Sequence, residues 1–392
     1  MLTSFAIIFL TGIFMSYIFT KLHLPSLMGT IFTGIIIGPY CLNLIDNSLL
    51  DISSHLRQIA LIIILTRAGL SLDFKQLKKS GRQALLMCFI PATFEIIGTI
   101  IFAPLIFNIS YLEAALIGSV LAAVSPAVVV PKMLKIINEG YGSLNQIPQI
   151  IMAGASADDI YVIVLFTAFS SILSGGNISV IDFVQIPISI ISGSLIGIIC
   201  GLSLIALFVK FHIRDTIKVL IILSISFLFL ALENISKNYI HISGLIAVMV
   251  LGMTLYTKYK NLAKRLSQKY NKLWVGAEII LFVLVGATIN PNNITTYGIS
   301  ILLLIFSAMI FRMLGVFISL LKTKLSMKER AFCMFAYTPK ATVQAAIGGI
   351  PLSMGLDCGN IVLSVAVVAI LITAPFGAFM IDTTYKKLLK NK

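Results

Sequence analysis

Apolar residues come in repeated blocks of about 20 along the chain, separated by short polar segments. A block of this length crosses a bilayer core as a helix. The backbone must be helical there because lipid satisfies no N–H or C=O group. The pattern predicts one all-α, polytopic membrane domain over residues 1–392. Its thirteen expected spans lie near residues 3–21, 25–44, 53–72, 84–106, 111–134, 147–172, 179–209, 216–234, 240–257, 273–290, 297–321, 329–350 and 359–381.

Composition and charge fit a membrane protein. The chain is 58% hydrophobic and 11% charged, whereas soluble proteins are about 25% charged. The net charge of +14 does not indicate nucleic-acid binding, because 24 of the 29 Lys and Arg residues fall in loops on one side of the predicted topology. The other side holds only Arg57 and Lys237. The positive-inside rule then places the N-terminus outside and the C-terminus in the cytoplasm. We expect a multi-pass protein of the bacterial inner (plasma) membrane, in contact with lipid.

The two halves of the chain repeat one order of features. The spacing from Gly69 to Glu95 is 26 residues, and so is the spacing from Gly286 to Arg312. One linker span separates the two sets of six spans, so the second set crosses the membrane in the opposite orientation. Secondary transporters with such inverted repeats have their ion site at the membrane midplane, where the two repeats meet. The expected parts are repeat one (residues 1–175), a linker helix (176–212) and repeat two (213–392).

Prolines interrupt corresponding spans of the two repeats. Pro126 and Pro339 each remove a helix hydrogen bond, which is tolerated at membrane depth where the chain lines a cavity or another helix. We predict two discontinuous helices that cross at their unwound points. Lys340 would offset the negative ends of the half-helix dipoles, and a purely structural role for it stays open. The residues expected at the crossing are Ser125, Pro126, Val129, Thr338, Pro339 and Lys340.

Two adjacent carboxylates, Asp158 and Asp159, lie in the middle of the sixth span. They cannot both be ionised there without a cation or a basic neighbour. Ser156 lies on the same helical face as Asp159 and offers a hydroxyl oxygen. We predict that Asp158, Asp159 and Ser156 form a shared cation and proton site, with the two aspartates as ligands of a transported Na⁺. The alternative is a structural aspartate pair, which would be expected at a helix end.

Glu95 and Arg312 occupy equivalent positions in the two repeats and have opposite signs. Charges at membrane depth need partners, so we expect these two to form an ion pair that orients the core helices. Arginine keeps its proton under physiological conditions. Arg312 therefore cannot be the proton carrier.

Several motifs along the chain occur together: Leu24-Pro25, Gly34, Gly38-Pro39, Arg67-Ala68-Gly69-Leu70, Ser125-Pro126-Ala127-Val128-Val129-Val130-Pro131, Asp158-Asp159 and Thr338-Pro339-Lys340-Ala341-Thr342-Val343-Gln344-Ala345-Ala346-Ile347-Gly348. This set resembles the cation/proton antiporter superfamily (CPA2), especially its NHA branch and the bacterial NapA-type sodium/proton antiporters. The resemblance implies a homodimer whose core domain moves like an elevator, exchanging Na⁺ or Li⁺ for H⁺ without a cofactor. Asp159 would be the family's ion-binding aspartate and Asp158 its neighbour.

The resemblance also bears on the number of protons exchanged. Where NapA-type electrogenic members have a lysine, this chain has Arg312, as NHA-type members do. That difference favours one proton per sodium.

Two other functions are weighed against this one. A potassium antiporter or cation channel of the same superfamily usually adds soluble nucleotide-binding domains, and this chain ends shortly after its last predicted span. An intramembrane aspartyl protease would need two carboxylates facing each other from different helices, whereas Asp158 and Asp159 are adjacent. We therefore expect a transporter and not an enzyme, with the preference among Na⁺, Li⁺ and K⁺ open.

Overall fold

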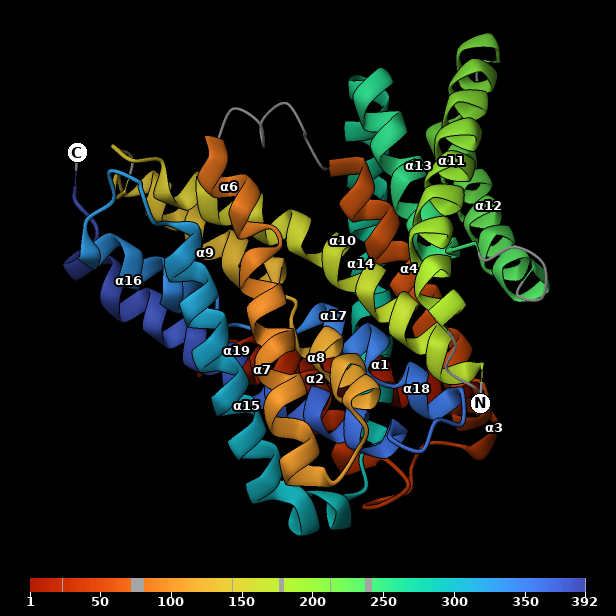
Figure 1. Cartoon of the computed structure of the whole chain (residues 1–392). Helices are drawn as coiled ribbons and strands as arrows, with labels where there is room; N and C mark the ends of the chain where they lie inside the picture. Colours follow the sequence, from red (N-terminus) through yellow and green to blue (C-terminus); the bar gives the residue numbers. More distant parts are fainter. Residues whose placement is uncertain are drawn as a thin grey trace. The chain divides into compact units, whose positions relative to one another are not determined.

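The computed structural model describes residues 1–22, 24–71, 81–142, 144–175, 180–211, 213–236 and 242–391. Regular structure in these residues is helical, apart from one isolated β-bridge between Tyr141 and Asn391. The helices (Figure 1) are α1 (Leu2–Lys21), α2 (Ser26–Ile37), α3 (Asn47–Asp51), α4 (Ser53–Ser71), α6 (Gly81–Met87), α7 (Ile90–Phe107), α8 (Tyr111–Leu121), α9 (Pro126–Asn138), α10 (Ile147–Ser174), α11 (Val180–Lys210), α12 (Asp215–Ser236), α13 (Gly244–Lys258), α14 (Lys260–Ala287), α15 (Pro291–Ser319), α16 (Met327–Ala336), α17 (Thr342–Ile347), α18 (Ile350–Ser353) and α19 (Gly359–Leu388).

Nine segments of the described chain are long and apolar enough to cross a membrane. They are Leu2–Lys21, Gly81–Phe107, Tyr111–Asn138, Ile147–Ser174, Pro187–Lys210, Asp215–Glu233, Lys260–Ala287, Tyr297–Ser319 and Gly359–Leu388. Two more apolar helices, α2 and α13, have only 12 and 15 residues. The multi-pass, all-α architecture is confirmed, while the count of thirteen spans stays a prediction.

The chain divides into two compact units. The first comprises Met1–Ser54, Gln76–Phe169 and Ile279–Lys392, and it contains both predicted discontinuous helices. The second comprises His55–Lys75 and Ser170–Glu278. All of the side chains expected at the ion site belong to the first unit.

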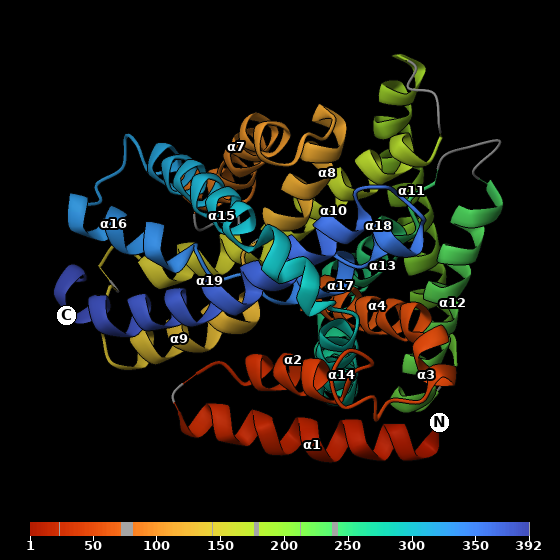
Figure 2. The same ribbon diagram turned by 90° about the horizontal axis from the view of Figure 1, so that it is seen from below.

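Helices α7 and α15 run side by side in the first unit (Figures 1 and 2). A Cβ atom on Gly98 of α7 would lie 2.7 Å from the Phe311 ring of α15, and one on Gly315 of α15 would lie 3.0 Å from the Phe94 Cβ of α7. Residues 94 and 98 correspond to 311 and 315 at the spacing that relates the two predicted repeats. The same two positions of each predicted repeat therefore contact each other, as in an isologous interface.

Glycines bring other helices of each unit into close contact. In the first unit, Cβ atoms on Gly34 of α2 and Gly286 of α14 would collide with the partner helix's backbone. In the second unit the same holds for Gly69 of α4 and Gly252 of α13. Small residues permit such close approach of membrane helices. The two pairs occupy equivalent helices of the predicted repeats.

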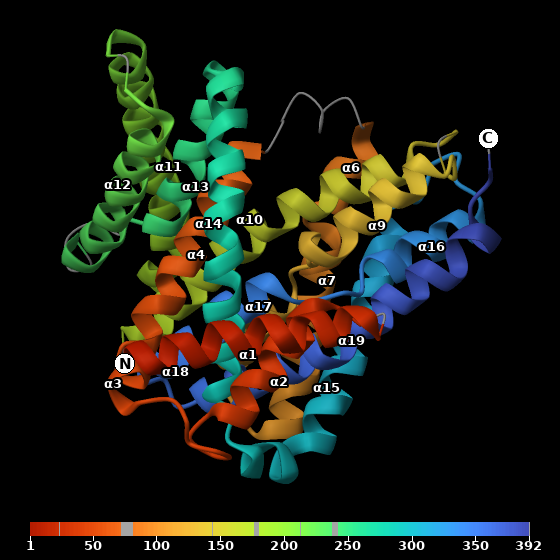
Figure 3. The ribbon, with the colours of Figure 1, turned by 180° about the vertical axis from the view of Figure 1, so that it is seen from behind.

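Within the second unit, α11 lies along α13 (Figure 3). Gly193, Gly197 and Gly201 recur every fourth residue on α11, and each faces the α13 segment. A Cβ atom on Gly197 would lie 2.6 Å from the Ala247 carbonyl. This spacing is the small-residue pattern by which membrane helices pack.

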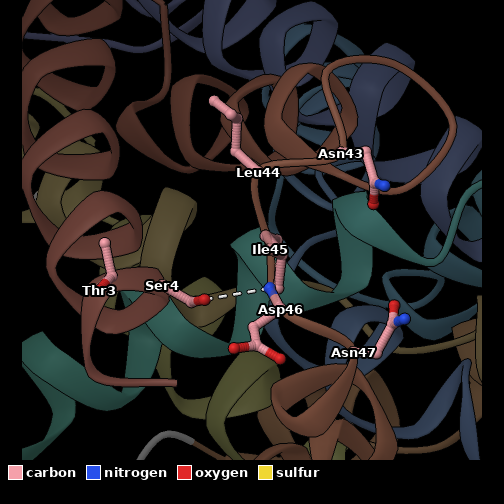
Figure 4. Close-up of a pocket in the computed structure, with 7 residues that line it drawn as sticks. All are labelled: Thr3, Ser4, Asn43, Leu44, Ile45, Asp46 and Asn47. Carbon is pink, nitrogen blue, oxygen red and sulfur yellow. Dashed lines mark hydrogen bonds between the residues drawn. The ribbon is translucent and has the colours of Figure 1, made fainter.

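The loop after α2 is tied to the start of α1. Asp46 caps α3 by accepting from the Ser48 N–H (3.1 Å), and its other oxygen pairs with the Met1 ammonium at 2.8 Å. The Met1 ammonium, together with hydrogen bonds from Ser48, lowers the pKa of Asp46 to about 2. The Asp46 N–H also donates to the Ser4 hydroxyl (3.0 Å). These contacts shape a pocket (Figure 4) lined by Thr3, Ser4, Asn43, Leu44, Ile45, Asp46 and Asn47.

Candidate functional site

The fifth predicted span is interrupted in its middle. Helix α8 ends at Leu121, and α9 begins at Pro126. Ser125 is extended (φ −86°, ψ 108°), because the residue before a proline is kept out of the helical region. Pro126 has no N–H with which to continue the α8 hydrogen bonds. The helix is therefore broken where the sequence predicted.

The twelfth predicted span is interrupted in a similar way. Helix α16 ends at Ala336, and α17 begins at Thr342, with Pro339 between them. The Thr338 hydroxyl donates back to the Phe335 carbonyl (2.9 Å), which completes the last turn of α16. Pro339 and Lys340 then form an irregular, fully enclosed segment.

The two unwound segments meet through their backbones. The Ser125 N–H donates to the Pro339 carbonyl at 2.8 Å. Val129 lies one turn into α9, where it is buried and its N–H donates to the Ser125 carbonyl (3.1 Å). The predicted crossing of two discontinuous helices is confirmed.

The carbonyls at the C-terminal end of α8 and just after it accept hydrogen bonds from side chains of the predicted second repeat. Leu121 O accepts from Lys340 Nζ (2.6 Å) and from Gln344 Nε2 (3.2 Å). Ala123 O accepts from the same Gln344 amide (2.8 Å), and Ala122 O accepts from Arg312. The C-terminal end of a helix leaves carbonyls unpaired and carries partial negative charge. The cationic side chains of Lys340 and Arg312 and the amide of Gln344 pair these carbonyls and offset the negative charge.

Four buried charges form one connected network. Arg312 contacts Glu95 at 2.7 Å and Asp158 at 2.9 Å, and Lys340 contacts the second oxygen of Glu95 at 2.6 Å. All four side chains are at most 1% exposed. Two acids and two bases cancel, so the network is electrically neutral. This balance is what makes burial of the four charges tolerable.

Two donors contact the Asp158 carboxyl group. Its Oδ2 atom accepts from Arg312 and from the Val124 N–H (2.9 Å) in the unwound segment after α8. Hydrogen bonds and a cation both favour the ionised form of a carboxylate. Asp158 is therefore part of the neutral network.

Asp159 is different from its neighbour. Its side chain is 7% exposed, and no basic side chain of the described residues lies within 4.0 Å of it. Its Oδ1 atom is buried without a hydrogen-bond partner in the same part of the chain. An isolated carboxylate is too costly to bury in ionised form. The Asp159 carboxyl group therefore lacks a compensating partner of this kind among the described residues.

Three other buried side-chain oxygens lie in the unwound segment after α8, in α10 and in α17. Ser125 Oγ, Asp158 Oδ1 and Gln344 Oε1 have no hydrogen-bond partner among the described residues. Oxygen atoms of this kind are the ligands that hard cations take. Ser156 was also predicted as a ligand, but the structure describes only its backbone in α10 and not its side chain.

The sequence profile of the family described as "Sodium/hydrogen exchanger, transmembrane" matches residues 5–387. The chain belongs to this family. Among its relatives, human sodium/hydrogen exchanger 9B2 is 31% identical over 386 residues, which cover 94% of this chain and 70% of the relative. Human sodium/hydrogen exchanger 9B1 is 32% identical, with 86% of this chain and 67% of the relative covered.

A solved structure has the same fold as this exchanger-family chain. The sodium proton antiporter MjNhaP1 from Methanocaldococcus jannaschii, at pH 8, superposes with a TM-score of 0.83 over 98% of this chain and 97% of that one. The two sequences are 21% identical, so the likeness concerns the fold alone. An electron-microscopy structure of the same antiporter gives a TM-score of 0.75.

These findings confirm that the chain is a member of the cation/proton antiporter superfamily. They also make it a transporter rather than an enzyme, since its relatives are exchangers. The aspartyl protease considered from the sequence therefore has no support. The roles of the individual site residues stay predictions.

The sequence did not single out two residues that the structure brings to the site. Gln344 donates to two carbonyls at once, so its amide nitrogen must face them and its oxygen must face away. Tyr337 contributes its carbonyl to Arg312 Nε (2.6 Å). The position of Gln344 in the motif after Pro339 could have identified it as a site residue. No feature of the sequence around Tyr337 indicates that it belongs to the site.

Proposed function

We propose that this exchanger trades Na⁺ or Li⁺ for H⁺ across the membrane, with Asp159 as the group that binds each in turn. The observation that carries the proposal is the charge balance of the core. Glu95, Asp158, Arg312 and Lys340 neutralise one another, and Asp159 adds one uncompensated carboxylate. A single negative site at membrane depth takes one cation or one proton, but not both.

The cation at this site would be held by oxygen atoms. Asp159 supplies the charge, and Asp158 Oδ1 has no other partner in the described residues. The Ser156 hydroxyl is a third candidate ligand from the same helix. The carbonyls of Leu121, Ala123 and Ala122 already accept from Lys340, Gln344 and Arg312, which favours side-chain oxygens as ligands.

The transport cycle we propose is of the elevator type. The resemblance to the superfamily implies a core domain that moves against a dimerisation domain, and the crossing of α8–α9 with α16–α17 would lie in the core. The fixed network around Arg312 would let these helices move as one rigid body. A homodimer in a bacterial plasma membrane, with the N-terminus outside, is part of the same proposal.

The charge balance also favours one proton per sodium. A second proton would have to come from Asp158 or Arg312. Arg312 keeps its proton. It donates to Asp158 together with the Val124 N–H, and such contacts favour the ionised carboxylate. Neither group is free to release or take a proton when the cation arrives.

The test is a cation titration in everted membrane vesicles from a host that lacks its own sodium/proton antiporters. Respiration acidifies the vesicle lumen, and a pH-sensitive dye reports the gradient. Na⁺ or Li⁺ should collapse the gradient in vesicles with this protein and not in empty ones. A response to K⁺ alone would support the potassium antiporter instead, and no response to any cation would overturn the proposal.

A further inference from the structure

The Tyr337 hydroxyl takes no part in the charge network, although it lies beside it. Tyr337 caps the end of α16 and is fully buried. Its hydroxyl has no hydrogen-bond partner in the described part of the chain. A buried hydroxyl without a partner lowers stability. An unsatisfied polar group of this kind therefore calls for a functional explanation.

Two contacts with Arg312 fix the position of this side chain. The Tyr337 carbonyl accepts from Arg312 Nε at 2.6 Å, and the guanidinium carbon of Arg312 lies 5.5 Å from the centre of the ring. A guanidinium over an aromatic face is attracted to it. The ring is thus oriented by the same arginine that holds Asp158.

The hydroxyl points at the backbone of α10. A Cβ atom on Gly154 would overlap the Tyr337 hydroxyl oxygen, and it would also lie 2.9 Å from the Met87 Cβ of α6. Only a residue without a side chain lets the hydroxyl approach α10 so closely.

Gly154 lies four residues before Asp158, so the two share one face of α10. Their Cα atoms are about 6 Å apart at 1.5 Å per residue. Asp158 Oδ1 also has no hydrogen-bond partner in the described residues. Side chains in an α-helix are tilted toward its N-terminus, so the Asp158 carboxyl group is directed toward the turn that contains Gly154 and the hydroxyl beside it. A single water molecule bridges two polar oxygens with hydrogen bonds of about 2.8 Å each, and such a water satisfies polar groups nearly as well as a direct contact does.

We propose that the Tyr337 hydroxyl and Asp158 Oδ1 hold a water molecule that hydrates the cation bound at Asp159. Tyr337 would then be a positioning residue of the ion site. The inference rests on the proposed function. Na⁺ is larger than Li⁺ and takes more oxygen ligands. Loss of this water should therefore weaken the binding of Na⁺ more than that of Li⁺.

The experiment compares purified wild-type protein with Tyr337→Phe in proteoliposomes. Phenylalanine keeps the ring against Arg312 and removes only the hydroxyl. The apparent KM for Na⁺ should rise on the order of tenfold, the effect of one hydrogen bond to a charged partner. The maximal rate should stay within about twofold, and the KM for Li⁺ should rise less than that for Na⁺.

Two further variants separate this role from simple packing. Gly154→Ala displaces the hydroxyl by its Cβ atom, so it should raise the KM for Na⁺ as Tyr337→Phe does. The double variant should be no worse than either single one, since both remove the same contact. Tyr161→Phe is the matched control. The Tyr161 hydroxyl lies on α10 and forms a hydrogen bond with Thr93 Oγ1 at 2.8 Å. Without it, Thr93 keeps its own hydrogen bond to the Phe89 carbonyl. Its KM should equal that of the wild type.

A second readout does not depend on transport. The Na⁺ concentration that half-saturates thermal stabilisation of the detergent-purified protein should shift with the KM in both Tyr337→Phe and Gly154→Ala. If wild type shows no exchange, the proposed function fails. If wild type exchanges normally while Tyr337→Phe keeps its KM and its Na⁺-to-Li⁺ KM ratio, the water-bridge inference alone is overturned. It is also overturned if the increases in KM of the two single variants multiply in the double variant.

Discussion

Arg312 holds more partners than any other buried side chain of the site. It contacts Glu95 and Asp158 as ion pairs and donates to the carbonyls of Tyr337 and Ala122. The planar, forked guanidinium can serve several acceptors at once, which an ammonium cannot match. The side chain thus links three helices and both unwound segments.

This arrangement predicts a strong coupling between Arg312 and Glu95. Either alanine substitution leaves buried charge without its partner, which costs roughly 3–5 kcal/mol. The Glu95→Ala/Arg312→Ala variant removes one charge of each sign, so it should be less destabilised than the sum of the two single variants. The measurement is the apparent melting temperature of the four proteins in detergent.

Surface pairs provide the matched comparison for this cycle. Lys132 and Asp382 form an ion pair with partly exposed side chains, and exposed pairs contribute at most about 1 kcal/mol. Their alanine cycle should therefore show little coupling. Strictly additive losses for Glu95 and Arg312 would mean that the two charges do not stabilise each other.

Part of this network was visible in the sequence. Equal spacing in the two repeats placed Glu95 opposite Arg312, because charges at membrane depth need partners. The binding of Asp158 by the same arginine was not visible. Adjacent residues on a helix point about 100° apart, and only the tertiary structure decides which of the two aspartates contacts Arg312.

At the scale of helices, the contact between α7 and α15 depends on glycine. A Cβ atom on Gly315 would lie 2.8 Å from the Pro91 Cα and 3.0 Å from the Ile90 carbonyl. Both are backbone atoms, which cannot move aside as a side chain can. The same helix carries Gly298, and no atom of the described residues lies within 4 Å of its Cβ position.

The two glycines of α15 therefore predict opposite effects of the same substitution. Gly315→Ala should destabilise the protein by about 1–3 kcal/mol through overpacking. Gly298→Ala should leave stability unchanged or raise it slightly, because alanine favours the helix. Melting temperatures of both variants check this. Equal behaviour of the two would contradict the close contact of α7 with α15.

The discontinuous helices were predictable because proline acts locally. Pro126 and Pro339 break a helix whatever surrounds them. The bond from the Ser125 N–H to the Pro339 carbonyl was not predictable in the same way. It joins segments more than 200 residues apart, and no local pattern encodes which backbone groups meet at that distance.

At the scale of the whole molecule, the arrangement of basic loops predicts the topology. Cys41 lies in the loop after α2 and is exposed, and the positive-inside rule puts this loop outside. The other cysteines are buried or partly buried: Cys88, Cys200, Cys333 and Cys358. A membrane-impermeant maleimide should therefore label intact cells at Cys41, and Cys41→Ser should remove the label. Labelling that appears only after the cells are permeabilised would show that this loop faces the cytoplasm and would contradict the predicted orientation.

Charge movement tests the stoichiometry. If one sodium exchanges for one proton, a sodium jump on a supported membrane without an imposed potential should produce no sustained current. The physical reason is that Arg312 and Asp158 are bound to each other and cannot supply a second proton. A sustained current that reverses with the sodium gradient and vanishes in Asp159→Asn would refute one-for-one exchange.

The central claim is that Asp159 alone neutralises either the cation or the proton. The most direct measurement is proton flux into or out of proteoliposomes after a sodium jump, with the membrane potential clamped and an internal pH dye as reporter. Wild type and the matched variant Asp357→Asn, at an exposed aspartate, should drive protons. Asp159→Asn should drive none while remaining folded, and sodium-driven proton flux at the wild-type rate in that variant would contradict the account.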